Sequence, residues 1–453
     1  MPVKPKIVTL TNSSADILNA IRNSATVDYR KYVPVATDDP EVIRKIGSII
    51  MDMPMLQNEF LSALVNRIGK VVLTSKLYSN PWATFKRGLL EFGETVEEIF
   101  VDLAKPFEYD PAFAENNVFK REIPDVKSAF HVLNYQKYYK STIQQNDLRK
   151  AFLNANGVTE LVGKIVDAMY SGANYDEFLT MKYLLAKHIL DGHLYPEELD
   201  DATDYADVAA TFKGVSNDLE FMDTKYNIVG VHNFTMKENQ HLFINSKYDA
   251  KMDVNVLATA FNMSKAEFMG HRHLIDGFGK LDTDRLAILF ADDPTYVPLT
   301  DAEIALLEDI PAVLVDEEFF MIFDNLFEFT EQYNGEGLYW NYFYHTWKIF
   351  SVSPFANAIV FATGAPSITS VTVTPATATV SAGATVHATA EVVTANFAPQ
   401  TVTWESSDTD VATVDGAGNI KVNPEASASD TATITATSTF DSTKTDTCVI
   451  TVA

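Results

Sequence analysis

The chain has 453 residues, of which 47% are apolar, and its formal net charge is −26. This length predicts at least two domains, because a single hydrophobic core stops growing at about 250–300 residues. The negative charge excludes proteins that bind nucleic acid or an anionic membrane through a basic surface. A single cysteine, Cys448, excludes an internal disulfide and a metal site built from thiolates. No apolar run approaches the roughly 18 residues of a membrane span, and we expect no export signal.

The first half of the chain contains strand and helix patterns. Phe85–Asp110 predicts strands joined at Gly88 and Gly93, with acidic side chains at the exposed positions. A two-stranded ribbon is marginal alone in water, so we expect this one to lie on a neighbour. From Val158 to Asp191 apolar residues recur at helical spacing, which predicts a helix roughly 50 Å long at 1.5 Å per residue. A helix of that length suits a structural spine.

Two short segments resemble ligand-binding loops only superficially. GVTELVGK (Gly157–Lys164) has five residues between its glycines instead of the four of a phosphate loop, and Ile165 stands where serine or threonine is required. The acidic run PEELDDATD (Pro196–Asp204) lacks the ligand spacing and the glycine of a calcium-binding loop. We therefore reject the phosphate site and expect a solvated acidic loop.

The histidines offer one candidate metal site. His271 and His273 in GHRHLIDG would share a face of a strand with Asp276 nearby, and two histidines with a carboxylate can bind a metal; surface or interface histidines would give the same pattern. His188 and His193 flank a predicted helix end, where a cation is favourable. There is no Gly-x-Ser-x-Gly motif, and Cys448 lacks a nearby base. We therefore assign no catalytic, cofactor-binding or metal-binding residue, and we expect neither enzymatic activity nor a cofactor.

The segment Tyr339–Phe350 is unusually aromatic, with seven aromatic residues in twelve. On a strand, Leu338, Trp340, Tyr342 and Tyr344 would share one face, and Tyr339, Asn341, Phe343 and His345 would share the other. Because both faces are rich in apolar atoms, the pattern favours a strand buried between layers over a platform for a sugar or a base. The polar tips of tyrosine and tryptophan suit a layer or subunit boundary.

The composition changes near Gly364–Ser367, after which serine, threonine, alanine and valine dominate. The tail alternates with period 2, which predicts about seven short strands in an immunoglobulin-like sandwich. We expect Trp404 to be its central core residue. The residues expected to face the core are Val371, Val373, Val386, Ala388, Ala390, Val392, Ala432, Ile434, Ala436, Cys448, Ile450 and Val452.

The stretch VTWESSDTDVATVDGAGNIKV (Val402–Val422) resembles the bacterial immunoglobulin-like group 2 domain. That family carries a tryptophan, then Ser-Ser-Asp, then Val-Ala-Thr-Val-Asp, then a glycine-containing hairpin, and all four elements stand here in order. The resemblance implies a fold for the tail and no activity.

A second resemblance covers nearly the whole chain. GLYWNYFYHTWKIFSVSPFANAIVF (Gly337–Phe361) closely resembles the end of the capsid domain in major capsid proteins of phi29-like podoviruses. Further matching pieces include YVPVAT (Tyr32–Thr37), GETVEEIF (Gly93–Phe100), VFKREIPDVKSAFH (Val118–His131) and AFNMSKAEFMG (Ala260–Gly270). Those proteins also end in a group 2 immunoglobulin-like domain. The segment Asp200–Asn239 matches least well.

This resemblance implies an α+β fold of the Hong Kong 97 type, followed by the all-β immunoglobulin-like sandwich. The implied organisation is a capsid domain at 1–366 and the immunoglobulin-like domain at 367–453. Within the capsid domain the implied parts are an N-terminal arm at 1–50, an extended-loop region at 75–140, a spine helix at 158–191, an axial domain at 192–335 and a return to the peripheral domain at 336–366.

The implied function is that of a major capsid protein that assembles with itself into hexamers and pentamers around double-stranded DNA. The implied partners are further copies of the chain, a scaffolding protein, a portal at one vertex, and a head fibre or host surface that meets the C-terminal domain. The implied location is the virion, after assembly in the host bacterial cytoplasm. Neither sequence-specific nucleic-acid binding nor membrane binding is expected. A cell-surface adhesin or surface-layer protein is the alternative that the tail alone would suggest.

Overall fold

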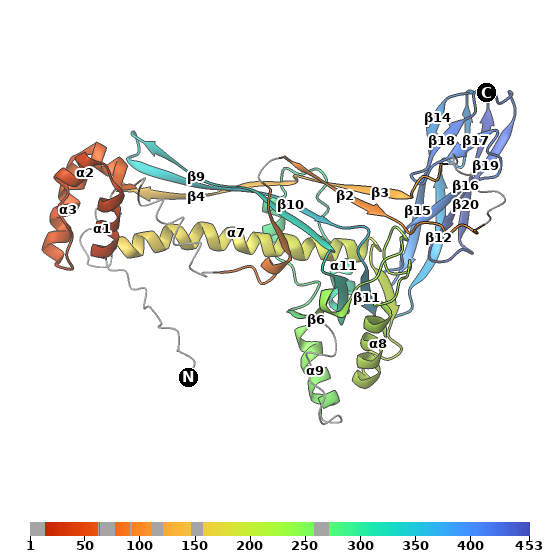
Figure 1. Ribbon diagram of the computed structural model, residues 1–453, viewed down its shortest axis with the longest axis horizontal. Helices are drawn as coiled ribbons and strands as arrows, with labels where there is room; N and C mark the ends of the chain where they lie inside the picture. Colours follow the sequence, from red (N-terminus) through yellow and green to blue (C-terminus); the bar gives the residue numbers. More distant parts are fainter. Residues whose placement is uncertain are drawn as a thin grey trace. The chain divides into compact units, whose positions relative to one another are not determined.

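The computed structural model describes residues 14–61, 63, 78–90, 93–109, 121–145, 157–257 and 271–453. The chain divides into two compact units, which are described separately below (Figure 1). The first unit comprises Met1–Thr95, Val132–Thr180 and Ile322–Phe350. The second comprises Val96–His131, Met181–Met321 and Ser351–Ala453. Among the described residues, no helix is both long and apolar enough to cross a membrane.

The first unit is built on a four-stranded sheet with the order β1-β9-β10-β4. Its strands are β1 (Lys86–Leu89), β4 (Tyr135–Gln144), β9 (Phe320–Asn334) and β10 (Tyr339–Val352). Strand β4 pairs antiparallel with β10 over ten residue pairs, from Tyr339 opposite Gln144 to Lys348 opposite Tyr135. Strand β1, which follows the short 3₁₀ helix η1 (Ala83–Phe85), pairs parallel with β9.

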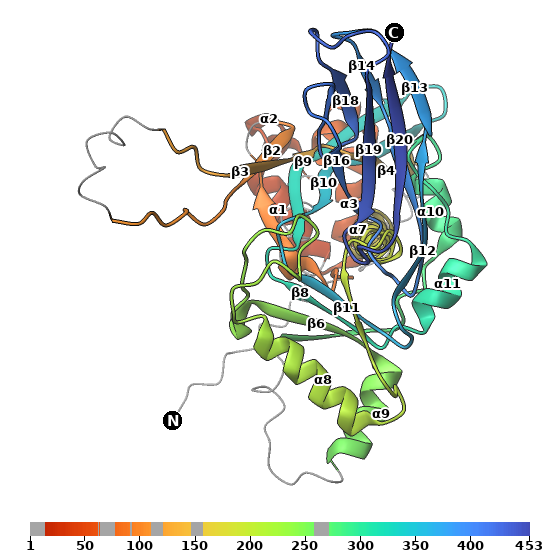
Figure 2. The ribbon, with the colours of Figure 1, turned by 90° about the vertical axis from the view of Figure 1, so that its right-hand side faces the viewer.

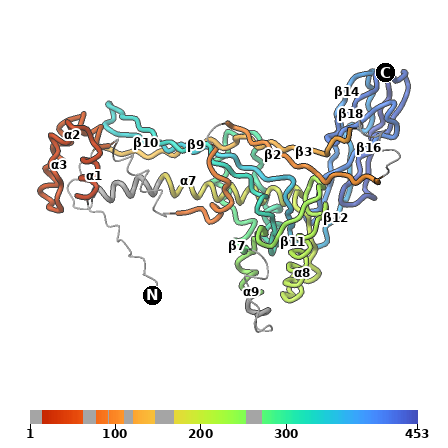
Figure 3. Tube along the Cα trace, viewed as in Figure 1, coloured from red at the N-terminus to blue at the C-terminus, as the bar shows by residue number. Residues whose placement is uncertain are grey.

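The long helix α7 (Gly157–Leu190) matches the predicted helix, beginning and ending one residue earlier than expected. The resemblance assigns residues 1–50 to an N-terminal arm. The described residues from 14 to 52 form three helices: α1 (Ser14–Ser24), α2 (Val27–Tyr32) and α3 (Pro40–Asp52) (Figure 3). Asp39 caps α3 by accepting a hydrogen bond from the Glu41 N–H at 2.9 Å, and Pro40 occupies its first turn. These helices bury Ile17, Leu18, Ile21, Tyr29, Ile43, Ile46 and Ile50 in one cluster with Met169, Trp340 and Tyr342.

The ribbon predicted within Phe85–Asp110 differs from the observed pairing. Strand β1 joins the sheet of the first unit, and β2 (Thr95–Val101) pairs with β3 (Val126–Val132) as a separate two-stranded sheet. The partner of β2 therefore comes from a later segment of the chain. We call the β2–β3 pair the ribbon; its two orange strands run side by side in Figure 1, and Figure 2 views them nearly end-on.

The aromatic segment forms β10, with one buried face and one half-exposed face. Trp340, Tyr342 and Tyr344 are buried, as a core strand predicts, but the opposite face is only partly covered within this chain. Leu338 was expected beside Trp340; instead it lies in the turn before the strand with φ +52° and is 50% exposed. The expected axial-domain boundary at 335 falls in the connection between β9 and β10, two neighbouring strands of one sheet.

The second unit contains a five-stranded mixed sheet with the order β5-β11-β8-β6-β7. Strands β8 and β11 read AVLVD and AIVFA and are buried at every position, because neighbours cover both faces. The poorly matched segment 200–239 contains helix α8, which Asp204 caps. The strands and helices are β5 (Tyr195–Glu198), β6 (Gln240–Asn245), β7 (His271–Ile275), β8 (Ala312–Asp316), β11 (Ala358–Ala362), α8 (Tyr205–Asp218), α9 (Ser246–Leu257), α10 (Thr283–Leu289) and α11 (Asp301–Glu308), with the 3₁₀ helix η2 (Lys237–Asn239).

The tail from Ser367 onward consists of nine strands instead of the seven expected. They are β12 (Ser367–Thr374), β13 (Thr377–Val380), β14 (Thr385–His387), β15 (Thr389–Ala395), β16 (Val402–Ser406), β17 (Ala412–Val414), β18 (Asn419–Val422), β19 (Thr431–Ser438) and β20 (Thr445–Val452). Most of the predicted inward residues are buried, including Ile434 and Ile450, while Val386 and Ala390 are half-buried. Trp404 is not the central core residue; it is half-buried and packs against the edge of the cluster.

Candidate functional site

The candidate histidine and carboxylate site does not assemble. His271 and His273 share a face of β7, as expected, and both rings lie against His241 of β6, with ring centres 5.0 and 5.2 Å away. Asp276 instead accepts a hydrogen bond from the Lys182 ammonium at 2.5 Å. Burial, with His273 and His271 nearby, lowers the pKa of His241 to about 4. Among the described residues, no three potential ligands are arranged so that they could hold a metal ion. Sequence reasoning missed His241 because it comes from a neighbouring strand, β6.

The other residues considered from the sequence have structural surroundings. Burial lowers the pKa of His188 to about 4, so its ring is neutral near pH 7. His188 therefore does not supply the cation that the end of the helix would favour. Pro196–Glu198 belong to β5, so only the remainder of the acidic run is a loop. Cys448 is fully buried in β20, and burial raises the pKa of its thiol.

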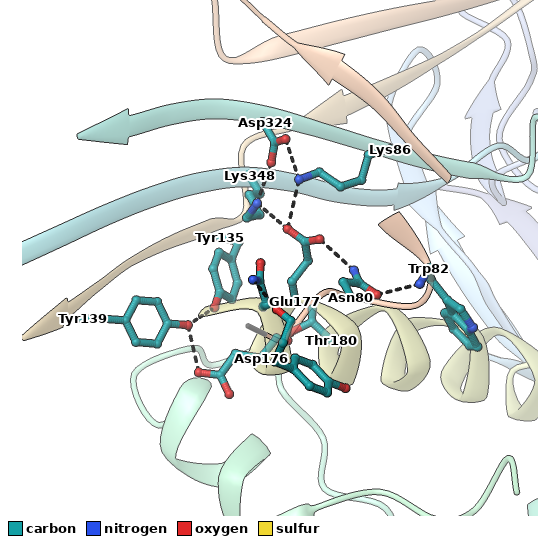
Figure 4. A network of polar contacts seen from close by, with 12 residues as sticks. Asn80, Trp82, Lys86, Tyr135, Tyr139, Asp176, Glu177, Thr180, Asp324 and Lys348 are labelled. Atoms are coloured by element: carbon teal, nitrogen blue, oxygen red, sulfur yellow. Dashed lines mark hydrogen bonds and ion pairs between the residues drawn. The ribbon is translucent and has the colours of Figure 1, made fainter. Parts of the chain in front are cut away.

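The first unit contains a buried cluster of two lysines and two carboxylates, which we call the ion cluster: Lys86, Glu177, Asp324 and Lys348 (Figure 4). Lys86 Nζ lies 3.2 Å from Glu177 Oε2 and 2.6 Å from Asp324 Oδ2. Lys348 Nζ lies 2.5 Å from Asp324 Oδ1 and also bonds Glu177 Oε2. Two positive and two negative charges thus alternate around a closed ring.

Four different elements supply the ion cluster. Lys86 comes from β1, Asp324 from β9, Lys348 from β10 and Glu177 from the middle of α7. The side chains of Lys348, Glu177 and Asp324 are 5%, 4% and 9% exposed, so water screens these charges little. The cluster therefore ties the long helix to three strands of its sheet.

Neutral groups complete the surroundings of Glu177. Asn80 Nδ2 donates to Glu177 Oε1 at 2.7 Å, and Asn80 Oδ1 accepts from the Trp82 N–H at 2.8 Å (Figure 4). Trp82 in turn meets Phe178 edge to face, with ring centres 5.3 Å apart. The turn before β1 is thereby attached to α7 by one polar contact and one aromatic contact.

The charges in the ion cluster stabilise one another. Burial by itself would raise the pKa of Glu177, but Lys348 and Lys86 outweigh it and hold that pKa below its ordinary value. Burial would likewise lower the pKa of Lys86, but Glu177 and Asp324 raise it. Both shifts favour the charged forms of Glu177 and Lys86, which is the condition under which a buried ion pair is stable.

A second polar contact lies one residue away on α7. Asp176 precedes Glu177 and points about 100° around the helix, away from the lysines. Tyr139 of β4 donates to Asp176 Oδ2 at 2.8 Å, and the hydroxyls of Tyr139 and Tyr135 lie 2.9 Å apart (Figure 4). Burial and the neighbouring groups raise the pKa of Tyr139, so it stays a donor. Consecutive acids on α7 thus bind both β4 and the ion cluster.

These contacts attach the long helix α7 to the sheet of the first unit. The family model for the Phi29-like phage major capsid protein matches residues 18–362, and that for the bacterial immunoglobulin-like domain (group 2) matches residues 367–449. The chain therefore belongs to the phi29-like phage major capsid protein family.

Curated relatives agree with this assignment. The chain is 37% identical to the major capsid protein of Bacillus phage B103 over 399 residues, which cover 86% of this chain and 82% of that protein. It is 35% identical to the major capsid protein of Bacillus phage PZA, covering 91% of this chain and 88% of that protein. A chain in the capsid structure of Staphylococcus phage Andhra is 16% identical, with a TM-score of 0.48, and covers 63% of this chain and 85% of that chain.

Proposed function

We propose that this major capsid protein assembles into hexamers and pentamers of an icosahedral or prolate head that encloses double-stranded DNA. Its fold would be of the Hong Kong 97 type, with α7 as the spine helix, residues 75–140 as the extended loop, residues 192–335 as the axial domain and residues 336–366 as the return to the peripheral domain. Residues 1–50 would act as the N-terminal arm, with 14–52 carried as three helices. The chain would be a structural component without enzymatic activity.

The observation that carries this proposal is the exposed apolar face of the ribbon. Residues on the outward face of β2 and β3 include Ile99 at 58%, Val101 at 58%, Phe130 at 64% and Val132 at 54% exposure. Contiguous exposed apolar surface in a soluble protein marks an interaction site. A second copy of the chain is the partner that a self-assembling shell provides, and repeated head-to-tail contacts close into rings when the rotation permits.

The remaining partners follow from the same proposal. A scaffolding protein would direct assembly in the host bacterial cytoplasm, and a portal would occupy one vertex. The immunoglobulin-like domain at 367–453 would meet a head fibre or the host surface. The net charge of −26 supports a lining that does not hold packaged DNA, and we expect neither sequence-specific nucleic-acid binding nor membrane binding.

Co-expression with the scaffolding protein, followed by electron microscopy, tests this proposal. The wild-type chain should form closed shells. The double variant Ile99→Ser and Phe130→Ser should remain folded, because both side chains are exposed in the isolated chain, but should form few or no shells. Ser128→Asn on the same exposed face is the matched control and should assemble normally. Normal shells from the double variant would contradict the proposal.

A further inference from the structure

The ribbon is attached to the rest of its unit by side chains and not by a shared sheet. Within the described part of the chain, β2 and β3 pair only with each other. Two strands alone are marginally stable in water. The direction in which the ribbon points therefore depends on its base, where Asn134 Nδ2 donates to the Phe350 carbonyl oxygen at 2.8 Å, and on the contacts made by its inward-facing side chains.

Polar groups fill part of that inward face. Glu98 Oε1 accepts a hydrogen bond from the Ser353 hydroxyl at 2.7 Å, and Glu98 Oε2 lies 3.1 Å from His131 Nε2. His131 Nδ1 lies 2.7 Å from the Ser351 hydroxyl oxygen, and the His131 side chain is only 2% exposed. Glu98 of β2 and His131 of β3 thus contact each other, and each also bonds a serine that lies more than 200 residues later in the chain.

A second histidine and carboxylate pair lies beside the first. Asp102, directly after β2, has its Oδ1 2.9 Å from His232 Nδ1. The Leu103 N–H and His232 hold the pKa of Asp102 below its ordinary value. Between the two pairs, Phe100 stacks on Phe355 with ring centres 5.4 Å apart.

The ribbon does not separate polar from apolar residues between its two faces as an ordinary surface sheet does. A sheet with one solvated face normally buries its apolar side. Here Glu98 and His131 face inward beside Phe100, while Ile99 and Phe130 face solvent. Hydrogen bonds depend on direction and distance more than apolar contacts do, so such an attachment selects one orientation and is lost once the atoms separate.

We infer that the Glu98–His131 and Asp102–His232 pairs, with Ser351 and Ser353, form a latch that sets the direction of the ribbon and can release it while β2 and β3 stay paired. The inference rests on the proposed function, because a releasable ribbon allows one chain to meet its neighbours at the different angles of hexamers and pentamers. The latch itself is a property of the single chain and can be measured before assembly.

Distance measurements between two spin labels test the latch in the unassembled full-length chain. One label is placed at Ser128→Cys on the exposed face of β3 and the other at Ala210→Cys, an exposed position of α8, in a chain whose buried Cys448 is replaced by alanine. The parent chain should give a single narrow distance. The double variant Glu98→Ala with Asp102→Ala should replace the narrow distance distribution with a broad one. The double variant Glu98→Gln with Asp102→Asn should broaden the distribution less.

Glu122→Gln provides the matched control. It removes a carboxylate from the same part of the chain, but Glu122 pairs only loosely with the exposed Lys105, at 4.0 Å. The control should keep the narrow distance. An unchanged distance in both latch variants would overturn the inference, as would a broad distance in the parent. Failure of the wild-type chain to form shells would instead contradict the proposed function and leave the measured latch standing.

Discussion

Replacing Lys348 with methionine should strongly destabilise the first unit. The side chain is 5% exposed and bonds both Glu177 and Asp324. Its loss leaves Lys86 alone between two buried carboxylates, so the ion cluster passes from neutral to one net negative charge. Breaking a buried ion pair from one side costs about 3–5 kcal/mol, because an uncompensated charge remains. That loss corresponds to roughly two to four powers of ten in the unfolding equilibrium.

Urea unfolding followed by tryptophan fluorescence measures this loss. Trp82 and Trp340 are buried in the first unit, and Trp404→Phe removes the signal of the tail. The double variant Lys348→Met with Glu177→Gln restores neutrality and retains the Lys86–Asp324 pair at 2.6 Å, so it should recover part of the stability. Lys105→Met is the matched control and should cost about 0–1 kcal/mol, because its pair is exposed. The reasoning fails if Lys348→Met costs less than about 1 kcal/mol or if the double variant loses the sum of the two single losses.

Three further predictions concern pH, hydroxyl groups and a glycine. The pKa of Glu177 in the folded chain is lowered from its ordinary value of 4.5. The contribution of Glu177 to stability is therefore complete above pH 4.5 and is lost as the pH falls through the pKa of the folded state. Stability should consequently fall more steeply with acid in the parent than in Glu177→Gln. Tyr139→Phe should lower the free energy of unfolding in urea by about 1.5–3 kcal/mol, because Asp176 loses a hydrogen-bond donor. Tyr342→Phe should leave that free energy unchanged or raise it, because within the described residues the Tyr342 hydroxyl is buried without a hydrogen-bond partner. Gly418→Ala should lower the free energy of unfolding of the tail, read from Trp404 fluorescence, by at least the roughly 1–2 kcal/mol that a left-handed residue costs. The reason is that φ is +81° and the new Cβ would lie 2.3 Å from the Ala388 carbonyl oxygen. Gly416→Ala, whose new Cβ would meet open space, is the control.

Local periodicity predicted the elements whose burial depends on a short stretch of chain. The alternation of Ala432, Ile434 and Ala436 identified a core face because each strand has one buried side. The helical spacing before Asp191 located α7 to within one residue. Trp404 was misplaced because residue size suggests burial but not depth, which is set by the partner strands.

The periodicity of the sequence does not predict contacts between segments that are far apart in the chain. Lys348 and Glu177 are 171 residues apart, and a lysine on a strand ordinarily indicates a solvated position. One signal was available: Lys348 has the same parity as Trp340, Tyr342 and Tyr344, so period 2 puts it on the buried face and requires a buried partner. The pairing of β2 with β3 was missed for a related reason, since pairing partners separated by a long loop leave no local turn signal.

A reconstruction of the assembled particle by electron cryomicroscopy tests the central claim most directly. In hexamers and pentamers alike, the side chains of Ile99 and Phe130 should be covered by a neighbouring copy of the chain. A shell in which that face of the ribbon remains in solvent, or lies against its own subunit, would contradict the account.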